Sequence, residues 1–246
     1  RIVAEYDAVE KNLSSDDKKV ILHLFQKLSS AKREIFEHQE LILTREKIDR
    51  KFIEDVLKKF KKLLSFKKIK EERWHEFFKE NGFIFSQLFA YPTVLFKDKA
   101  YVGGKTIQDD SGKIVDFLYA NKLTRNSVLI EIKKHTTKLL SNKPYRGSDV
   151  FHMDKELSGA INQALDQKET YCKQFETIRR PEDDITSFNP RCVIIIGKID
   201  MLSKKQLKAF ELLRSSFKDI EIIAFDELYI RINSILSIFK KDDNKS

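Results

Sequence analysis

Two apolar runs separated by a polar turn constrain the fold of this chain more than any other feature. Residues 115–134 read VDFLYANKLTRNSVLIEIKK, and the runs on either side of NKLTRN are rich in β-branched and aromatic residues. That pattern predicts a β-hairpin. Asp116 and Glu131 lie within the apolar runs, although a buried charge is costly unless it is paired or bound to a metal. The two acids therefore mark a candidate site.

The predicted hairpin would gather charged side chains on one face of a sheet. Successive side chains of a strand alternate between faces, so Glu131 and Lys133 project together, away from the face of Ile132. Pairing across the turn would place Asp116 beside Glu131. Two neighbouring carboxylates repel each other unless a cation lies between them, so the pattern predicts a cation site.

Mg²⁺ suits this predicted site, because it takes oxygen ligands and keeps several of its waters. We expect Asp116, Glu131 and the backbone carbonyl of Ile132 to bind it, and Mn²⁺ to be able to replace it. In phosphodiester hydrolysis an ammonium stabilises the transition state, which is the role expected of Lys133. The alternative is a salt-bridged edge strand, because a Glu-x-Lys spacing often arises by chance in a chain with 35% charged residues.

Composition limits the class of protein. The chain has 246 residues, is 41% hydrophobic and contains 19 Phe, which is enough for a packed core and argues against disorder. Its net charge of +9 favours a polyanionic partner such as DNA, although a basic balance alone does not identify one. Cys172 and Cys192 form no C-x-x-C motif, so neither a disulfide framework nor a zinc site is expected, and a reducing cytoplasm fits.

The sequence predicts no contact with a membrane or with ATP. The apolar run at 193–196 is far too short to cross a bilayer, and no signal segment opens the chain. The sequence carries no Walker motif, so ATP hydrolysis is not expected. Because residue 1 is Arg rather than Met, we expect the N-terminus to be trimmed.

The first part of the chain predicts helices. Residues 14–70 contain no Gly or Pro and carry apolar residues at helical spacing, and SSDD at 14–17 supplies N-cap chemistry. The segment LKKFKKLLSFKKIK at 57–70 holds seven Lys and no acid, and a solvated helix face is favoured over a phosphate-contacting face. The apolar positions exceed what one isolated helix can bury, so segment 14–70 is the expected site of subunit contacts.

The rest of the chain predicts an α/β domain. An amphipathic helix is expected at 71–80, ended by Asn81-Gly82, and short strands are expected in FIFSQLF, TVLF and KAYVGGKTIQ before the hairpin. After the hairpin the pattern predicts a loop, a helix, a loop, a strand, a helix, a strand and a last helix: 138–154, 154–179, 181–190, 192–197, 203–217, 221–225 and from 226. The order strand, helix, strand predicts parallel strands.

Several segments together carry a resemblance to a known family: ERWHEFFKENGFIF, GGK, VDFLY, LIEIKK, ELSGAINQ, VIIIGKID and EIIAFDEL. From about residue 71 to 239 the chain resembles the PD-(D/E)xK nuclease superfamily and, within it, the nuclease domain of the Shedu anti-phage defence proteins. The resemblance implies a restriction-endonuclease-like mixed β-sheet core flanked by helices, a Mg-dependent DNA endonuclease and a homo-oligomer such as a tetramer. It makes Asp116 and Glu131 the metal-binding acids and Lys133 the catalytic lysine, with Val115 in place of the literal Pro.

Many members of that superfamily carry a further Gln, often as Q-x-x-x-Y, on the helix after the core. Gln163, Gln167 and Tyr171 fall on one face of the helix predicted at 154–179. Gln163 fits the position after ELSGAIN and is preferred as the catalytic residue. Gln167 with Tyr171 has the Q-x-x-x-Y spacing, and Gln167 is expected to contact nucleic acid. The alternative for all three is an ordinary solvated helix face.

Other side chains have less specific assignments. Lys134 and Arg146 follow the second strand of the hairpin and are expected to contact the phosphate backbone, which would make binding salt-sensitive. Glu72 and Glu76 could join the site, although surface salt bridges are favoured for them. His135 could touch substrate, but a lone His is more often structural.

The sequence therefore predicts a helical N-terminal segment at 1–70, an α/β nuclease domain at 71–240 and a polar tail at 241–246. The predicted function is metal-dependent DNA cleavage in prokaryotic anti-phage defence. The rival hypothesis is a non-catalytic DNA-binding or assembly module that keeps the nuclease fold, which would not need Asp116, Glu131 and Lys133 together. A helical scaffold with a basic arm would not explain the charged strand interior.

Overall fold

A computed structural model describes residues 38–105 and 112–242 of the chain. The chain divides into two compact units, Arg1–Ile48 and Asp49–Ser246. The first unit is described only from residue 38, as the beginning of helix α3 (His38–Leu64), and the helix predicted to start at SSDD lies outside the described residues. The second unit begins within α3, so residues 49–64 belong with the α/β domain that the sequence places at 71–240.

The second unit is built on one mixed sheet of five strands in the order β1-β2-β3-β4-β5. The strands are β1 (Thr93–Tyr101), β2 (Ile114–Asn121), β3 (Asn126–Ile132), β4 (Thr186–Ile195) and β5 (Ile220–Ile223). β1, β2 and β3 pair antiparallel, which confirms the hairpin predicted between β2 and β3. β3, β4 and β5 pair parallel, as the strand, helix, strand order predicts. The predicted α/β class is confirmed.

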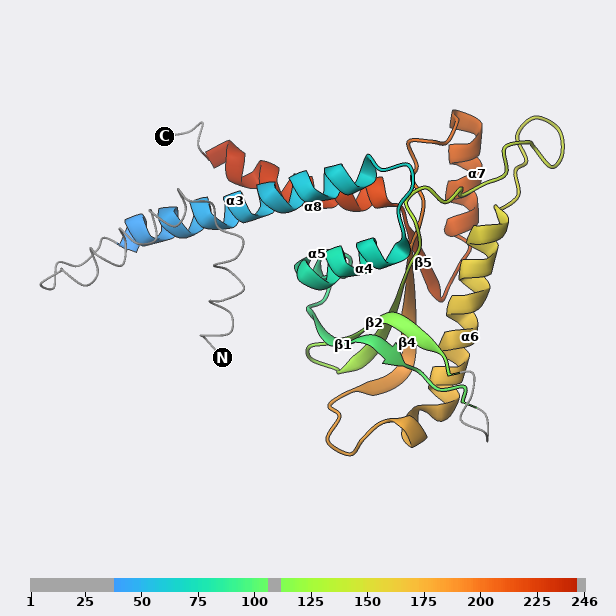
Figure 1. The fold of residues 1–246 in the computed structure, drawn as a ribbon, viewed down its shortest axis with the longest axis horizontal. Helices are drawn as coiled ribbons and strands as arrows, with labels where there is room; N and C mark the ends of the chain where they lie inside the picture. The colour runs from blue at the N-terminus through green and yellow to red at the C-terminus, as the bar shows by residue number, and fades with distance from the viewer. Residues whose placement is uncertain (1–37, 106–111, 243–246) are drawn as a thin grey trace, which may run out of the picture. The chain divides into compact units, whose positions relative to one another are not determined.

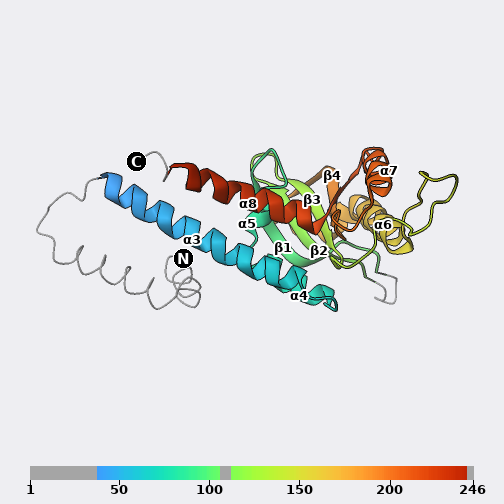
Figure 2. The ribbon, with the colours of Figure 1, turned by 90° about the horizontal axis from the view of Figure 1, so that it is seen from above.

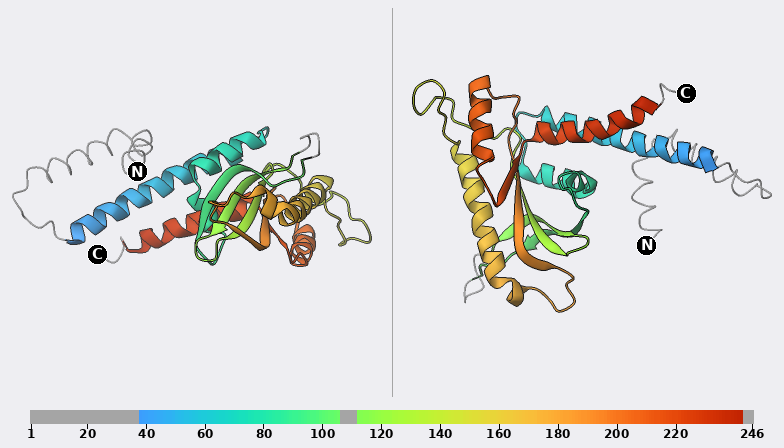
Figure 3. Two further views of the ribbon diagram at one scale, coloured as in Figure 1. Left: turned by 90° about the horizontal axis from the view of Figure 1, so that it is seen from below. Right: turned by 180° about the vertical axis from the view of Figure 1, so that it is seen from behind.

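Helices cover both faces of the sheet (Figures 1 and 3). Helices α6 (Lys155–Ile178) and α7 (Lys204–Arg214), which connect the parallel strands, lie on one face. Helices α4 (Glu71–Glu80) and α5 (Phe83–Ser86) lie on the other. The last helix, α8 (Phe225–Asp242), runs beside the second half of α3, as Figures 1 and 2 show. No helix of the described residues is long and apolar enough to cross a membrane.

An aromatic cluster fills the face under α4. Phe60 of α3 meets Trp74 of α4 with ring centroids 5.2 Å apart, and Trp74 meets Phe225 of α8 at 4.4 Å. All three rings are fully buried, and Ile130 of β3 belongs to the same cluster. Edge-to-face and tilted aromatic pairs add to the free energy gained by burial. The apolar face predicted for the helix at 71–80 therefore packs α4 against the sheet and against the helices α3 and α8.

A second apolar cluster lies on the opposite face, under α6 and α7. It contains Leu129 of β3, Ile194 of β4, Ile161 of α6 and Phe210 of α7. Helix α6 begins where the Asp154 side chain accepts a hydrogen bond from the Glu156 amide at 3.1 Å, which is an N-cap. Strand β3 thus sends alternate side chains into two different clusters, as the strand period predicts.

The segment FIFSQLF was predicted as a strand, and that prediction is wrong, because its first part forms the short helix α5. The Phe85 amide donates to the Gly82 carbonyl at 3.1 Å, so the backbone bonds locally rather than to a neighbouring strand. Phe85 packs against Phe78 at 5.0 Å and Phe117 at 5.2 Å. Packing decides the conformation here, whereas the aromatic side-chain types alone favour a strand.

Three predicted boundaries also differ from the structure. TVLF and KAYVGGKTIQ contribute to one strand, β1, in which a register irregularity lies between Leu95 and Lys97. Strand β4 begins at Thr186, inside the loop predicted at 181–190, because Thr186 pairs with Asn126 of β3. Helix α3 ends at Leu64, so only the first part of the lysine-rich segment 57–70 is helical.

Candidate active site

The predicted charged residues lie in a row across three strands. In the register of β2 and β3, Phe117 pairs with Ile130, which places Asp116 opposite Glu131. On the other side of β2, Asp98 pairs with Phe117 and Ala100 with Val115, so Lys99 lies opposite Asp116. The hairpin brings the two acids together as its pattern predicts.

Glu131 is held by side chains from two elements. Its Oε1 accepts hydrogen bonds from Lys133 Nζ at 2.8 Å and from Gln163 Nε2 at 2.9 Å. Its Oε2 faces Gln167 Nε2 at 3.5 Å, where a hydrogen bond is weak, so this oxygen keeps the capacity to bind a cation. Only 6% of the residue is exposed. Burial raises the pKa of the Glu131 carboxyl, and the nearby Asp116 carboxylate raises it further.

The Lys133 side chain bridges strand β3 and helix α6 through hydrogen bonds. Its Nζ donates to Glu131 Oε1 and to Gln163 Oε1, the latter at 3.0 Å. Burial alone would lower the pKa of this ammonium, but the Glu131 carboxylate outweighs that effect with help from Glu71 and Asp116, so the pKa is raised. The lysine is therefore charged at neutral pH, oriented by two partners and still partly open to solvent, with 19% of its side chain exposed.

Asp116 is fixed at both carboxylate oxygens. Its Oδ2 accepts from the Ile132 amide at 2.8 Å, and its Oδ1 forms an ion pair with Lys99. The Asp116 carbonyl lies 3.3 Å from His75 Nε2, and the His75 ring stacks on Phe117 with centroids 4.5 Å apart. The peptide unit of Ile132 thus lies beside the acids, whereas its side chain is buried in the aromatic cluster.

Helix α6 places both candidate glutamines at the site. Gln163 bonds Glu131 and Lys133, and Gln167 also donates to the Ile114 carbonyl at 3.0 Å. Tyr171, one turn further along, bonds Ser127 Oγ at 2.7 Å. Gln167 and Tyr171 are buried, so the alternative of a solvated helix face is wrong for both. Gln163 is the more exposed of the two glutamines and the one that contacts the lysine, which suits its predicted role.

The structure adds two charged residues that the sequence patterns missed. Lys99 belongs to no motif, and its place opposite Asp116 follows only from the register of β1 with β2. Glu71, the first residue of α4, lies near enough to Lys133 to raise its pKa, whereas the sequence directed attention to Glu72 and Glu76. Glu76 forms an exposed salt bridge with Arg73 at 3.1 Å, as favoured for it, and Glu72 is exposed.

The remaining predicted residues lie outside this group. His135 is 1% exposed, and its Nδ1 accepts a hydrogen bond from Trp74 Nε1 at 3.1 Å, so it belongs to the aromatic cluster. Lys134 and Arg146 are exposed, and Arg146 lies in the long loop before α6, where it forms an isolated bridge with Val150. Their exposed side chains are open to contact with a large ligand.

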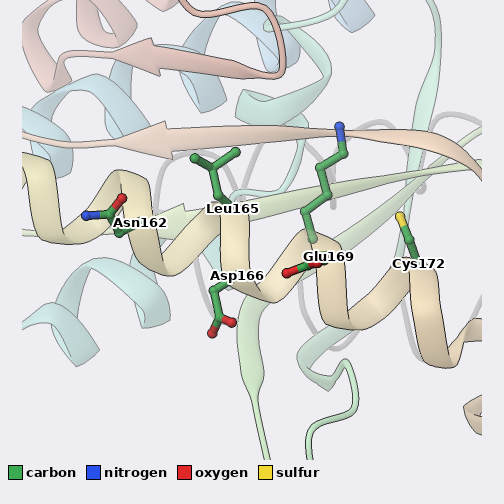
Figure 4. Close-up of a pocket in the computed structure, with 6 residues that line it drawn as sticks. Asn162, Leu165, Asp166, Glu169 and Cys172 are labelled. Carbon is green, nitrogen blue, oxygen red and sulfur yellow. The ribbon is translucent and has the colours of Figure 1, made fainter.

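A shallow hollow on the surface of α6 is separate from this site (Figure 4). Its lining residues all come from α6: Asn162, Leu165, Asp166, Lys168, Glu169 and Cys172. None of the predicted site residues lines it, and it opens widely to solvent. It therefore does not mark the reactive centre.

The donor set of the site fits a hard divalent cation. Within residues 38–105 and 112–242, no group of three or more His, Cys, Asp or Glu side chains is arranged to hold a metal ion. Asp116 and Glu131 offer carboxylate oxygens side by side, and the Ile132 peptide adjoins them. Mg²⁺ accepts such a set, because waters complete its coordination. Softer ions would require His or Cys ligands.

The part of the chain that holds the sheet and the site matches a known family. Residues 68–229 match the model of the family described as Shedu protein SduA, C-terminal, and all the site residues lie in that span. The Shedu protein SduA of Bacillus cereus (strain B4264) is 40% identical over 177 residues, which are 69% of this chain and 46% of that protein. The chain therefore belongs to the Shedu SduA family and spans less than half of this relative.

Proposed function

We propose that this chain is a metal-dependent DNA endonuclease that acts in anti-phage defence, and that its sheet is a restriction-endonuclease-like core. The observation that carries the proposal is the contact of Glu131 with both Lys133 and Gln163 beside a second carboxylate, Asp116. A buried acid with a raised pKa next to an oriented lysine is typical of catalytic sites. Membership of the Shedu SduA family supports the defence role.

In the proposed mechanism Asp116, Glu131 and the Ile132 carbonyl would hold Mg²⁺. When bound, that ion supplies an activated water and neutralises charge on the scissile phosphate. Lys133 stays a charged ammonium and donates hydrogen bonds to the attacking water or to a phosphate oxygen, where negative charge develops in the transition state. Gln163 keeps the Lys133 ammonium in position through its Oε1, and the Ile132 amide fixes the orientation of Asp116.

The proposed substrate is DNA, because the chain carries a net charge of +9 and the exposed ammonium of Lys99 lies beside Asp116. Arg146 and Lys134 would contact phosphates without reading sequence. Tyr145, which is 76% exposed beside Arg146, offers a ring on which a base or sugar can pack. Binding should therefore weaken steeply as salt is raised.

We also propose that the chain forms a homo-oligomer. The mass of the purified chain in solution would test this proposal.

The test is cleavage of supercoiled and linear DNA with Mg²⁺, Mn²⁺ or EDTA. We expect cutting or nicking that requires the metal and falls at least about a hundredfold in Lys133→Ala, because an oriented transition-state donor is lost. Lys173→Ala is the matched control, since Lys173 is an exposed lysine that pairs with Glu169 further along α6. Metal-independent cutting, or equal rates in Lys133→Ala and the wild type, would contradict the proposal.

A non-catalytic DNA-binding module is the second outcome that this experiment resolves. If DNA stays intact under every metal condition while a gel shift forms, the chain binds DNA without cutting it. That result would rule out the proposed nuclease activity, whereas the fold and the proposed DNA binding would stand.

A further inference from the structure

Lys99 neutralises one of the two acids of the site. Its ammonium is paired with Asp116 Oδ1, and it lies opposite Asp116 in the pairing of β1 with β2. Asp116 is the shielded partner, with 12% of its side chain exposed against 52% for Lys99. Glu131 has a lysine partner of its own, Lys133. Each carboxylate is therefore matched with a different ammonium.

The backbone of Lys99 is unusual. Its φ is +46°, in the left-handed region that residues with a Cβ rarely adopt. Such a conformation costs on the order of 1 kcal/mol and persists only where the surroundings impose it, often at functional sites. Lys99 lies within β1, between Asp98 and Ala100, which both keep regular partners on β2. The strained residue is thus the one whose side chain meets Asp116.

The adjacent strand residue forms an ordinary surface pair on the other face. Asp98 bonds Lys79 of α4 at 2.7 Å, and Lys79 is as exposed as Lys99, with 58% of its side chain open to solvent. The two pairs lie one residue apart on β1 and on opposite faces of the sheet, because Lys79 belongs to α4 whereas Asp116 lies beside Glu131, which contacts α6. Lys79 and Asp98 therefore provide a matched comparison for Lys99 and Asp116.

We propose that Lys99 competes with the divalent cation for Asp116 and so sets the metal affinity of the site. This inference rests on the proposed function. A cation held by Asp116 and Glu131 needs a lone pair of Asp116, whose Oδ2 accepts from the Ile132 amide and whose Oδ1 is paired with Lys99. A divalent cation at this carboxylate would also repel the Lys99 ammonium, so metal binding would weaken or displace the ion pair. Lys99 is a positioning residue, since it acts through Asp116.

Displacement leaves an exposed ammonium beside the metal site. A phosphate oxygen of DNA is the partner that such a cation binds, so DNA would hold Lys99 away from Asp116. Metal and DNA would then strengthen each other's binding, because both favour the arrangement in which Lys99 has left Asp116. Weak metal binding without DNA would restrain the enzyme until substrate arrives.

The test is titration of the purified chain with MnCl₂ in the absence of DNA, followed by the electron paramagnetic resonance signal of free Mn²⁺. We expect Lys99→Met to bind Mn²⁺ about fivefold more tightly than the wild type, because an ion pair of about 1 kcal/mol no longer competes. Lys99→Asn, whose side chain tolerates a left-handed backbone, should show the same gain. Lys79→Met should keep the wild-type affinity.

Two results would overturn the inference: equal affinity in Lys99→Met and the wild type, or an equal gain in Lys79→Met, which would reflect net charge alone. Asp116→Asn separates this failure from that of the proposed function. If Asp116→Asn abolishes Mn²⁺ binding while Lys99→Met leaves it unchanged, the competition is wrong and the metal site stands. If Asp116→Asn binds Mn²⁺ as the wild type does, the metal site and the inference both fail.

Discussion

The two faces of strand β3 are equally buried but have different partners. On one face Ile130 is 0% exposed and packs among aromatic rings, and on the other Ser127 and Glu131 are 0% and 6% exposed. The polar face is tolerated because α6 supplies a hydrogen-bonding group for each of these side chains, from Tyr171 and Gln163. Burial alone therefore does not separate the core of this protein from its site. The covering helix does.

The two covering helices carry different side chains for these tasks. Helix α4 presents Trp74, Phe77 and Phe78 to the sheet and contributes mainly packing. Helix α6 combines apolar positions such as Ile161 with the amides that contact Glu131. Changes under α4 should therefore affect stability, and changes at the polar positions of α6 should affect chemistry.

The largest expected effect comes from removing the central ring under α4. Trp74→Ala should lower the free energy of unfolding by about 3–5 kcal/mol, because it leaves a large cavity and deprives His135 of a hydrogen bond. Unfolding in urea should be followed by circular dichroism rather than by Trp fluorescence. Trp74 is the only Trp of the chain, so the variant has no Trp signal. Leu212→Ala, at a 65% exposed position of α7, should cost less than about 0.5 kcal/mol. Equal losses in both variants would contradict the packing role.

A smaller effect is expected on the polar face. Gln163→Leu should reduce the rate of DNA cleavage about tenfold or more, because a hydrogen bond to a charged group is worth about 1.5–3 kcal/mol. Its unfolding free energy should fall much less than that of Trp74→Ala, since Gln163 is exposed and Lys133 still donates to Glu131 Oε1. Asn162→Leu, next to it on α6 and away from Glu131, is the control for both measurements. A Gln163→Leu variant that unfolds easily but cleaves normally would reverse the roles of the two faces.

The smallest effect is a pH dependence of the aromatic face. Burial and then Lys198 lower the pKa of His135, while Asp200 and the backbone groups of Phe66 and Leu64 oppose the shift. The contribution of neutral His135 to the free energy of unfolding is complete above about pH 6.5, the pKa of an unperturbed His. It is lost as the pH falls through the lowered pKa of His135 in the folded protein.

Urea unfolding at pH 7.5 and at successively lower pH measures this dependence. The wild type should lose stability toward acid more steeply than His135→Gln, which cannot titrate at this position. Parallel pH profiles for the two proteins would show that His135 is not responsible.

The sequence was sufficient to predict the fold and the site residues wherever the interaction that decides them is local in the chain. Strand alternation and the short turn of the hairpin predict that Asp116 and Glu131 meet, because a hairpin sets its own register. Lys99 could not be found in this way, since its place depends on how β1 pairs with β2 across residues 102–113. Helical spacing put Gln163 and Gln167 on one face, but which atoms each meets depends on how α6 packs on the sheet. The strand prediction for FIFSQLF was wrong because tertiary packing outweighs the preference of its aromatic side chains for strands.

The most direct test of the division between the two faces is the behaviour of Glu131→Gln with supercoiled DNA and Mg²⁺. The amide is isosteric and can still accept from Lys133, so the variant should fold with the circular dichroism spectrum of the wild type. Its cleavage should fall at least about a hundredfold, because the carboxylate proposed to hold the metal is lost. A folded Glu131→Gln protein that cleaves DNA at the wild-type rate would show that the buried acid under α6 is not a catalytic site.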